Sequence, residues 1–217
     1  MEDYLMHYGV KGMHWGIRRY QPYSSKGLAK KIHSKARKKE AKITSDVVSA
    51  AQSAGSKMYG LEHKLKTKES IARKIKTDSI EKDISLEESA KDIKDAVRYT
   101  TISTEKNFVA NYNKVKKKLE SKGYKEERCK NYFDLYRQGK VKHKSVQSIF
   151  SDKDGYKFEI QFQTPKSQKA KDAKVPIYEE RRKPGNSAEK NAELEKRMDA
   201  LAEAVPDPKD IYKIKTH

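Results

Sequence analysis

The sequence has one cysteine, no long apolar run and few apolar residues overall, and each shortage excludes a class of protein. Cys129 stands alone, which excludes an intramolecular disulfide framework and a cysteine-based zinc site. No stretch resembles a signal-peptide core or a membrane span, so we expect no membrane partner. We expect the protein to act in the cytoplasm or to leave the cell by a route other than secretion. Apolar residues make up 35% of the 217 residues, so we expect a compact core over only part of the length.

Positive charge is in excess. Lys and Arg number 50 and Asp and Glu 31, which gives a formal net charge of +19. Such an excess attracts polyanions by counterion release and carries no sequence specificity. Nucleic acid, nucleotides and anionic surfaces are all admissible partners, and a highly soluble basic protein is the alternative.

The texture of the sequence divides the chain into four parts. Residues 1–24 form a leader, and residues 25–55 form a basic arm or linker that is a candidate nucleic-acid contact, with KKIHSKARKKEAK as its densest block. Residues 56–182 hold nearly all the strand-like and amphipathic patterns and form the domain. Residues 183–217 contain a C-terminal helix, with Asn186 as its N-cap and Pro206 as its stop.

The order of elements within the domain predicts an α+β fold. We expect helices over 67–76 and from Ser85, a strand over 96–103, and a helix capped by Thr104 and stopped by Gly123. Two strands over 144–151 and 156–164 follow as a hairpin, then a helix over 167–182 interrupted near Pro176. The result is a small mixed β-sheet flanked by helices.

The strand in GYKFEIQFQT poses the question of function. Phe158, Ile160 and Phe162 alternate with polar residues, which is typical of a strand with one buried face. Glutamate is depleted in strands, so the other face, which carries Glu159, is typical either of the wall of a wet cleft or of a plain solvated surface.

Cations and carboxylates elsewhere offer a matching chemistry. The segment KLKTKESIARK leads a basic loop into a helix start, where amide groups and lysines favour polyphosphate, although a solvated basic helix start looks the same. Asp95 forms an acidic pair with Glu159 if their strands are neighbours, and a divalent cation would turn the repulsion of that pair into attraction. Paired acids facing a lysine-rich loop are what magnesium-assisted phosphoryl chemistry requires.

Taken in order, these segments resemble the synthetase domain of the RelA/SpoT family over about residues 56–182. The resemblance rests on the basic-loop spacing and on DAVRYT, KNY, HKSVQSI, FEIQFQTPKS and YEERR. It implies a nucleotidyltransferase-like fold and transfer of the pyrophosphate of ATP to a ribose 3′-hydroxyl, on a guanine nucleotide or on the 3′ end of a tRNA.

The resemblance also implies residue roles. Asp95 and Glu159 are the catalytic pair and the Mg²⁺ ligands, and Glu159 helps to deprotonate the attacking hydroxyl. His143 and Gln161 bind the acceptor. The residues that hold the donor ATP are Lys64, Lys66, Ser70, Lys74 and Arg98.

Four positions depart from the family pattern. The family usually has arginine in place of Lys64, and its metal-binding aspartate stands where this chain has Ile93. His143 replaces the tyrosine that stacks on the acceptor base, and Gln147 replaces the family's histidine. A protein that keeps the fold without the catalysis is therefore the alternative.

The amino terminus carries a second resemblance. HYGVKGMHWGIRR is similar to a short leader of proteins encoded near phage head genes, and its glycines and aromatic residues suit docking of Tyr8–Arg19 on a phage capsid or scaffold. The sequence predicts a phage or prophage pyrophosphotransferase in the host bacterial cytoplasm, with packaging in the virion left open. The alternative is a non-catalytic, nucleic-acid-binding virion or assembly protein.

Overall fold

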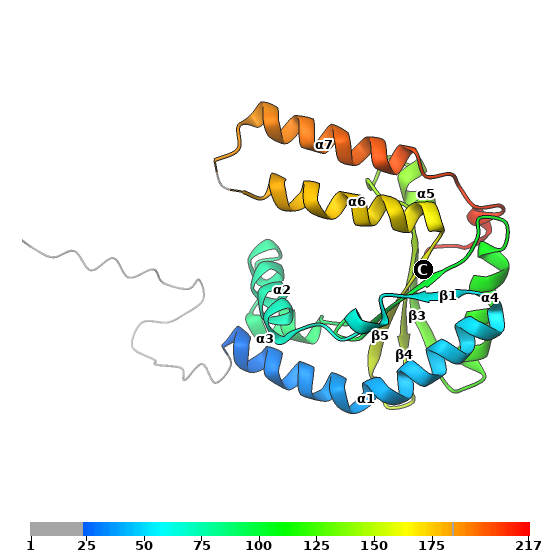
Figure 1. Ribbon diagram of the computed structural model, residues 1–217. Helices are drawn as coiled ribbons and strands as arrows, with labels where there is room; N and C mark the ends of the chain where they lie inside the picture. The colour runs from blue at the N-terminus through cyan, green and yellow to red at the C-terminus, as the bar shows by residue number, and fades with distance from the viewer. Residues whose placement is uncertain (1–23, 184) are drawn as a thin grey trace, which may run out of the picture.

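The computed structural model describes residues 24–183 and 185–217, so the leader over Tyr8–Arg19 lies outside the described residues. The described part confirms the α+β class, because five strands form one mixed sheet flanked by helices (Figure 1). The elements in chain order are α1 (Ser25–Ala54), β1 (Lys57–Tyr59), η1 (Leu61–His63), α2 (Lys68–Glu81), α3 (Leu86–Lys91), β2 (Arg98–Ile102), α4 (Phe108–Glu120), β3 (Lys125–Asn131), α5 (Tyr132–Arg137), β4 (Val146–Ser151), β5 (Lys157–Gln163), α6 (Pro165–Arg181), α7 (Ala188–Glu203) and η2 (Ile211–Lys213).

The sheet has the strand order β1-β2-β5-β4-β3. Its neighbours β2 and β5 are parallel, and the other pairs are antiparallel. The register places Arg98 opposite Glu159. Because side chains alternate between faces, Arg98, Glu159 and Gln161 lie on one face, and Tyr99 and Phe158 lie on the other.

The apolar face of the sheet packs against α1 and α4. Tyr112 of α4 meets Phe162 edge to face at 4.9 Å between ring centroids, and Tyr99 meets Phe158 in the same way at 6.1 Å. The Tyr99 hydroxyl lies 2.8 Å from the hydroxyl of Thr44 on α1. Burial of this face supplies the main hydrophobic driving force of the fold. Its polar face lies toward α6, on the side of the sheet away from α1 (Figure 1).

Helix α1 corrects the expected boundary of the domain. Residues 25–55 were expected to form an arm or linker, but Ile43, Val47 and a row of alanines on α1 belong to the same buried core as the sheet. Ser24 caps the start of this helix, and Gly55 ends it in the left-handed region, at a φ of 80°. The basic residues of α1 therefore form the outer surface of a core helix.

A cluster around Asp46 ties α1 to the turn after α4. The carboxylate accepts hydrogen bonds from Lys122 (2.6 Å), Lys42 (2.9 Å) and the Tyr124 hydroxyl (2.8 Å). Burial by itself raises the pKa of Asp46, but these three donors outweigh it and lower the pKa to about 2.

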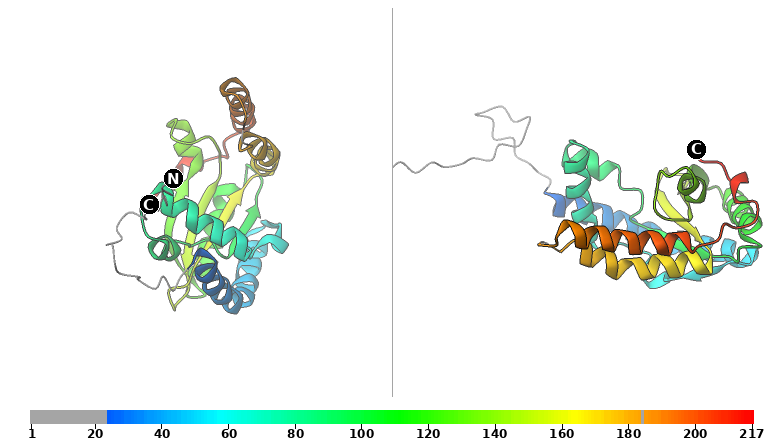
Figure 2. Two further views of the ribbon diagram at one scale, coloured as in Figure 1. Left: turned by 90° about the vertical axis from the view of Figure 1, so that its left-hand side faces the viewer. Right: turned by 90° about the horizontal axis from the view of Figure 1, so that it is seen from above.

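Three helix starts or interruptions also differ from expectation. Helix α6 continues through Pro176, which removes one backbone hydrogen bond, and α7 runs antiparallel beside it (Figure 2). Helix α7 is capped by Ser187, whose hydroxyl accepts from Lys190, whereas the Asn186 amide donates to the Glu180 carbonyl. Helix α4 begins only at Phe108, because a turn occupies the residues after Thr104.

Candidate active site

The parallel pair β2 and β5 places a buried carboxylate at the centre of the polar face. Glu159 is 8% exposed, and its neighbours on the same strand face, Gln161 and Gln163, are buried as well. The Gln161 amide donates to the Glu159 carboxylate. The second face of β5 is therefore not a solvated surface, and Glu159 stands in an enclosed polar site.

Asp95 lies in the segment just before β2 and faces the same charges. Its Oδ2 accepts a hydrogen bond from the Lys66 ammonium group. Its Oδ1 is buried without a hydrogen-bond partner. A buried carboxylate oxygen without a partner is costly unless something else binds it.

The charges around Glu159 show which groups surround it. Burial raises the pKa of Glu159, and the nearby charge of Asp95 raises it further. The hydrogen bond from Gln161 and the charges of Arg98 and Lys66 act in the opposite direction. The expected acidic pair is thus electrostatically coupled, and the raised pKa makes Glu159 a stronger base than an exposed glutamate.

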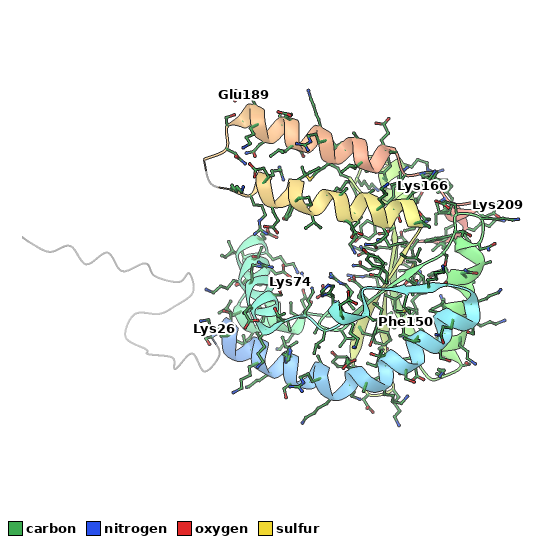
Figure 3. All side chains as sticks on the ribbon, viewed as in Figure 1. Lys26, Lys74, Phe150, Lys166, Glu189 and Lys209 are labelled. Carbon is green, nitrogen blue, oxygen red and sulfur yellow. The ribbon has the colours of Figure 1, made fainter. Side chains whose placement is uncertain are left out.

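A cation-lined cavity of about 550 Å³ opens beside this centre, and we call it the cationic cavity. Lys66, Ser70, Lys74 and Arg98 line it, as the sequence analysis expected for a polyphosphate site. Ser70 lies in the first turn of α2, where its amide donates to the capping hydroxyl of Thr67 and the helix dipole favours anions. Figure 3 shows Lys74 on α2, on the opposite side of the opening from α6.

Lys64 does not join this group. It follows η1 with helical backbone angles, and its ammonium group pairs with Glu40 of α1 at 3.2 Å. The side chain therefore serves the contact between α1 and the loop, and it does not line the cationic cavity. The expected contact between Lys64 and ATP phosphates has no support in this geometry.

Sequence reasoning missed several residues of the cationic cavity. Arg73 of α2 lines it, as do Tyr178 and Arg182 from the end of α6. The Arg182 guanidinium lies 5.4 Å from the centre of the Tyr178 ring, a cation–π distance. The YEERR segment at the end of α6 was the available signal, since it places Tyr178 and Arg182 four residues apart on a helix.

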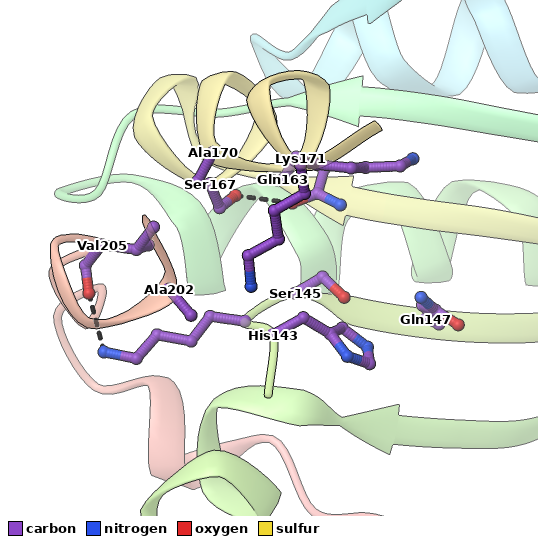
Figure 4. A pocket seen from close by; sticks show the side chains of 11 residues that line it. His143, Ser145, Gln147, Gln163, Ser167, Ala170, Lys171, Ala202 and Val205 are labelled. Carbon is purple, nitrogen blue, oxygen red and sulfur yellow. Dashed lines mark hydrogen bonds between the residues drawn. The ribbon is translucent and has the colours of Figure 1, made fainter. Parts of the chain in front are cut away.

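A smaller cavity of about 130 Å³ lies against α6 and the end of α7, and we call it the histidine cavity (Figure 4). His143 lines it and lies over the Tyr132 ring at 4.2 Å between centroids, with a tilt of 35°. Burial lowers the pKa of His143 to about 4, and the charges of Lys174 and Lys171 add to this shift. His143 is therefore neutral at pH 7.

The two expected acceptor residues are connected through α6. Lys171 lines the histidine cavity together with His143 and donates a hydrogen bond of 2.6 Å to Gln161. Gln161 in turn holds Glu159. The buried carboxylate is thus linked to both cavities: its strand neighbour Arg98 lines the cationic cavity, and Gln161 connects it through Lys171 to the histidine cavity.

The carboxylates fit a Mg²⁺ ion held partly by substrate. Within residues 24–183 and 185–217 no group of three or more His, Cys, Asp or Glu residues could hold a metal by itself. Magnesium is usually bound by one or two carboxylates together with substrate phosphates. Asp95, with its unpartnered buried oxygen, and Glu159 meet that requirement beside the cationic cavity.

Comparison with solved structures identifies the fold. Small alarmone synthetase 1 from Bacillus subtilis, bound to its product pppGpp, matches with a TM-score of 0.53 and 14% identity over 80% of this chain and 86% of that chain. Small alarmone synthetase 2 from the same organism matches with a TM-score of 0.52 and 16% identity over 80% of this chain and 91% of that chain. The chain has the small alarmone synthetase fold. At these identities the likeness concerns the fold alone, and it confirms the nucleotidyltransferase-like architecture that the RelA/SpoT resemblance implied.

Comparisons of sequence add less. Residues 1–22 match the model of a family of unknown function (DUF7211). That description carries no role, so docking by the leader stays a prediction. No curated protein matches the chain. In the part of the chain that the structure describes, no helix has the length and apolar character needed to span a membrane.

Proposed function

We propose that the protein transfers the pyrophosphate of ATP to a ribose 3′-hydroxyl of a nucleotide or a tRNA. The observation that carries the proposal is the position of Glu159, a buried carboxylate with a raised pKa that is linked through Arg98 to the cationic cavity and through Gln161 and Lys171 to the histidine cavity. Two pockets linked to one base suit two substrates that meet at it.

The cationic cavity is the donor site. Its volume of about 550 Å³ falls within the range of small-molecule sites. Lys66, Lys74 and Arg98 bind the β- and γ-phosphates, and the Ser70 hydroxyl at the start of α2 adds a donor. Tyr178, which also lines the cavity, offers an aromatic face to the base.

Transfer needs one proton acceptor and a stabilised leaving group. Glu159 accepts the proton of the 3′-hydroxyl while the hydroxyl oxygen forms a bond to the β-phosphorus of ATP. The bond between the β-phosphorus and the oxygen of the α-phosphate breaks, and AMP leaves. Arg98 and Lys66 stabilise the charge on the phosphates. When bound, Mg²⁺ supplies charge neutralisation at these oxygens, and Asp95 and Glu159 are the residues that would hold it.

The histidine cavity is the acceptor side. A neutral His143 against Tyr132 offers an aromatic surface for a base or a ribose. A neighbour of this fold is a small alarmone synthetase bound to pppGpp, which supports guanine nucleotides as the first acceptors to test.

The test is a transfer assay with ATP labelled at the β- and γ-phosphates. GDP, GTP and bulk tRNA are offered in turn, with Mg²⁺ or with EDTA. We expect label on at least one acceptor, loss of transfer in EDTA and in Glu159→Gln, and unchanged transfer in Glu193→Gln, which alters an exposed glutamate of α7. A folded wild-type protein that labels none of these acceptors would reject the enzyme.

A second function is favoured by a hollow of about 450 Å³ on α1. Four cations line it, Lys30, Arg37, Lys38 and Lys68, and none of the four forms an ion pair with a described carboxylate. Such a surface suits the phosphate backbone of nucleic acid. In this second candidate the protein is a non-catalytic virion or assembly component that docks through residues 8–19.

The two functions respond differently to one variant. If nucleic-acid binding on α1 is the function, the double substitution of Arg37 and Lys38 by Glu weakens binding to a nucleic-acid strand and flattens its salt dependence, while Glu159→Gln leaves binding unchanged. Fluorescence anisotropy at several salt concentrations measures both. Equal binding by the wild-type protein and the double variant would exclude this surface.

A further inference from the structure

Helix α6 folds directly back over the polar face of β5 and forms two successive bonds with it. Thr164 and Ser167 form a capping box that starts the helix at the end of the strand. The Ser167 hydroxyl donates to Gln163 at 2.5 Å, as Figure 4 shows, and one turn later Lys171 donates to Gln161 at 2.6 Å. Four helical residues advance about 6 Å and two strand residues about 6.6 Å, so the helix and the strand stay in step.

The lysine fixes the orientation of the amide that holds Glu159. An ammonium group can only donate hydrogen bonds, so Gln161 must turn its oxygen toward Lys171 and its NH₂ group toward Glu159. A reversed amide would place NH₂ against an ammonium group and oxygen against a carboxylate. The sequence of donors therefore runs in one direction, from Lys171 through Gln161 to Glu159.

The cost of this arrangement indicates a role beyond packing. Burial lowers the pKa of Lys171, and the charge of Arg98 lowers it further. Among the described residues Lys171 forms no ion pair, and its hydrogen bond goes to a neutral amide. A half-buried ammonium group without a carboxylate partner is unfavourable, so a residue that served only to fill space here would be apolar.

We propose that Lys171 is a positioning residue that acts through Gln161 to fix which oxygen of Glu159 is free to face the substrates. The inference rests on the proposed transfer reaction. The Gln161 amide occupies one Glu159 oxygen, and the other oxygen is the one left for the substrates, in a site where the charges of Asp95, Arg98 and Lys66 act on the carboxylate. Loss of the lysine lets the amide turn, and the carboxylate then loses its fixed orientation.

The experiment uses the full chain with Lys171→Met, Lys171→Arg and, as a control, Lys169→Met, which alters an exposed lysine of the same helix. Methionine keeps the length of the side chain without a donor, and arginine keeps a donor-only cation. We expect Lys171→Met to lower kcat by about 10- to 100-fold with KM for ATP unchanged, Lys171→Arg to recover part of the loss, and the control to match wild type.

A second measurement does not depend on activity. The side-chain NH₂ signals of Gln161, assigned by their absence in Gln161→Met, should exchange slowly with solvent in wild type and at least about 10-fold faster in Lys171→Met. Unchanged kcat together with unchanged exchange overturns the positioning role and leaves the proposed transfer intact. A raised KM for the acceptor with kcat unchanged also overturns it, because Lys171 would then bind the acceptor directly. If wild type transfers nothing, the proposed function fails, and the exchange measurement alone decides whether Lys171 orients Gln161.

Discussion

The assignment of α1 to the core can be tested with one buried isoleucine. Ile43 on α1 is 1% exposed and belongs to the same apolar cluster as the sheet. Ile43→Ala removes three carbon groups, which at about 0.8 kcal/mol each contribute a little over 2 kcal/mol. The cavity left behind brings the expected loss in the free energy of unfolding to about 3 kcal/mol.

Ile80 provides the matched control, because the same substitution there alters a side chain that is 81% exposed on α2. We expect Ile80→Ala to change the free energy of unfolding by less than about 0.5 kcal/mol. Urea denaturation followed by circular dichroism measures both variants. If Ile43→Ala costs no more than Ile80→Ala, residues 25–54 form an arm outside the core and the reasoning from burial fails.

Three further predictions concern charge. Glu159→Gln should lower the rate of transfer by about 10²- to 10⁴-fold and leave the protein at least as stable as wild type at pH 7. The reason is that the pKa of Glu159 is raised in the folded protein, so wild-type stability falls as pH rises from about 4.5 through that pKa. A variant that is less stable than wild type in urea at pH 7 would contradict this. Lys66→Ala should raise KM for ATP by about 10-fold in steady-state kinetics, and Lys64→Ala should leave it unchanged. If both variants raise KM equally, Lys64 also binds ATP. Asp46→Asn should lower the free energy of unfolding by on the order of 2 kcal/mol at pH 7, because folding lowers the pKa of Asp46 from 3.8 to about 2. In urea titrations the free energies of unfolding of the two proteins should converge as pH falls through about 2, and a difference that stays constant with pH would exclude this linkage.

Local signals in the sequence were sufficient for several elements. The alternation in β5 predicted its buried apolar face, and α2 and α3 begin where expected, with Thr67 and Ser85 as their caps. These features depend on residues at most four positions apart, where a side chain reaches its own backbone. They were predictable because no distant contact decides them.

Elements that depend on distant contacts were missed. Strand β3 has the sequence KEERCKN, which is mostly charged, and it forms because β4 pairs with one edge while His217 bonds to the backbone of Cys129. Strand β1 has only three residues and pairs with β2. In α1 the buried side is largely alanine, which gives a weak apolar pattern beside many lysines.

The candidate site divides in the same way. Glu159 was found because a glutamate in the middle of an apolar strand pattern is anomalous. Lys171 stands ten residues after Gln161 on another element, and its bond to Gln161 follows from the turn of α6 back over β5. Lys64 was placed at the site by its spacing from Lys66, but the helical turn before it directs its side chain to α1 instead.

The interface between α6 and the sheet favours the enzyme over the binding module. The buried residues of α6 are Ser167 and Gln168, and the strand face beneath carries Glu159, Gln161 and Gln163. A helix that only had to cover a sheet would bury apolar side chains there, which stabilise more than hydrogen-bonded polar pairs do. A protein that binds nucleic acid through the surface of α1 has no use for this polar interior on the opposite side of the sheet. A reaction centre requires buried polar groups even though they lower the stability of the protein, because the charges that act on a substrate must be held in place before the substrate binds.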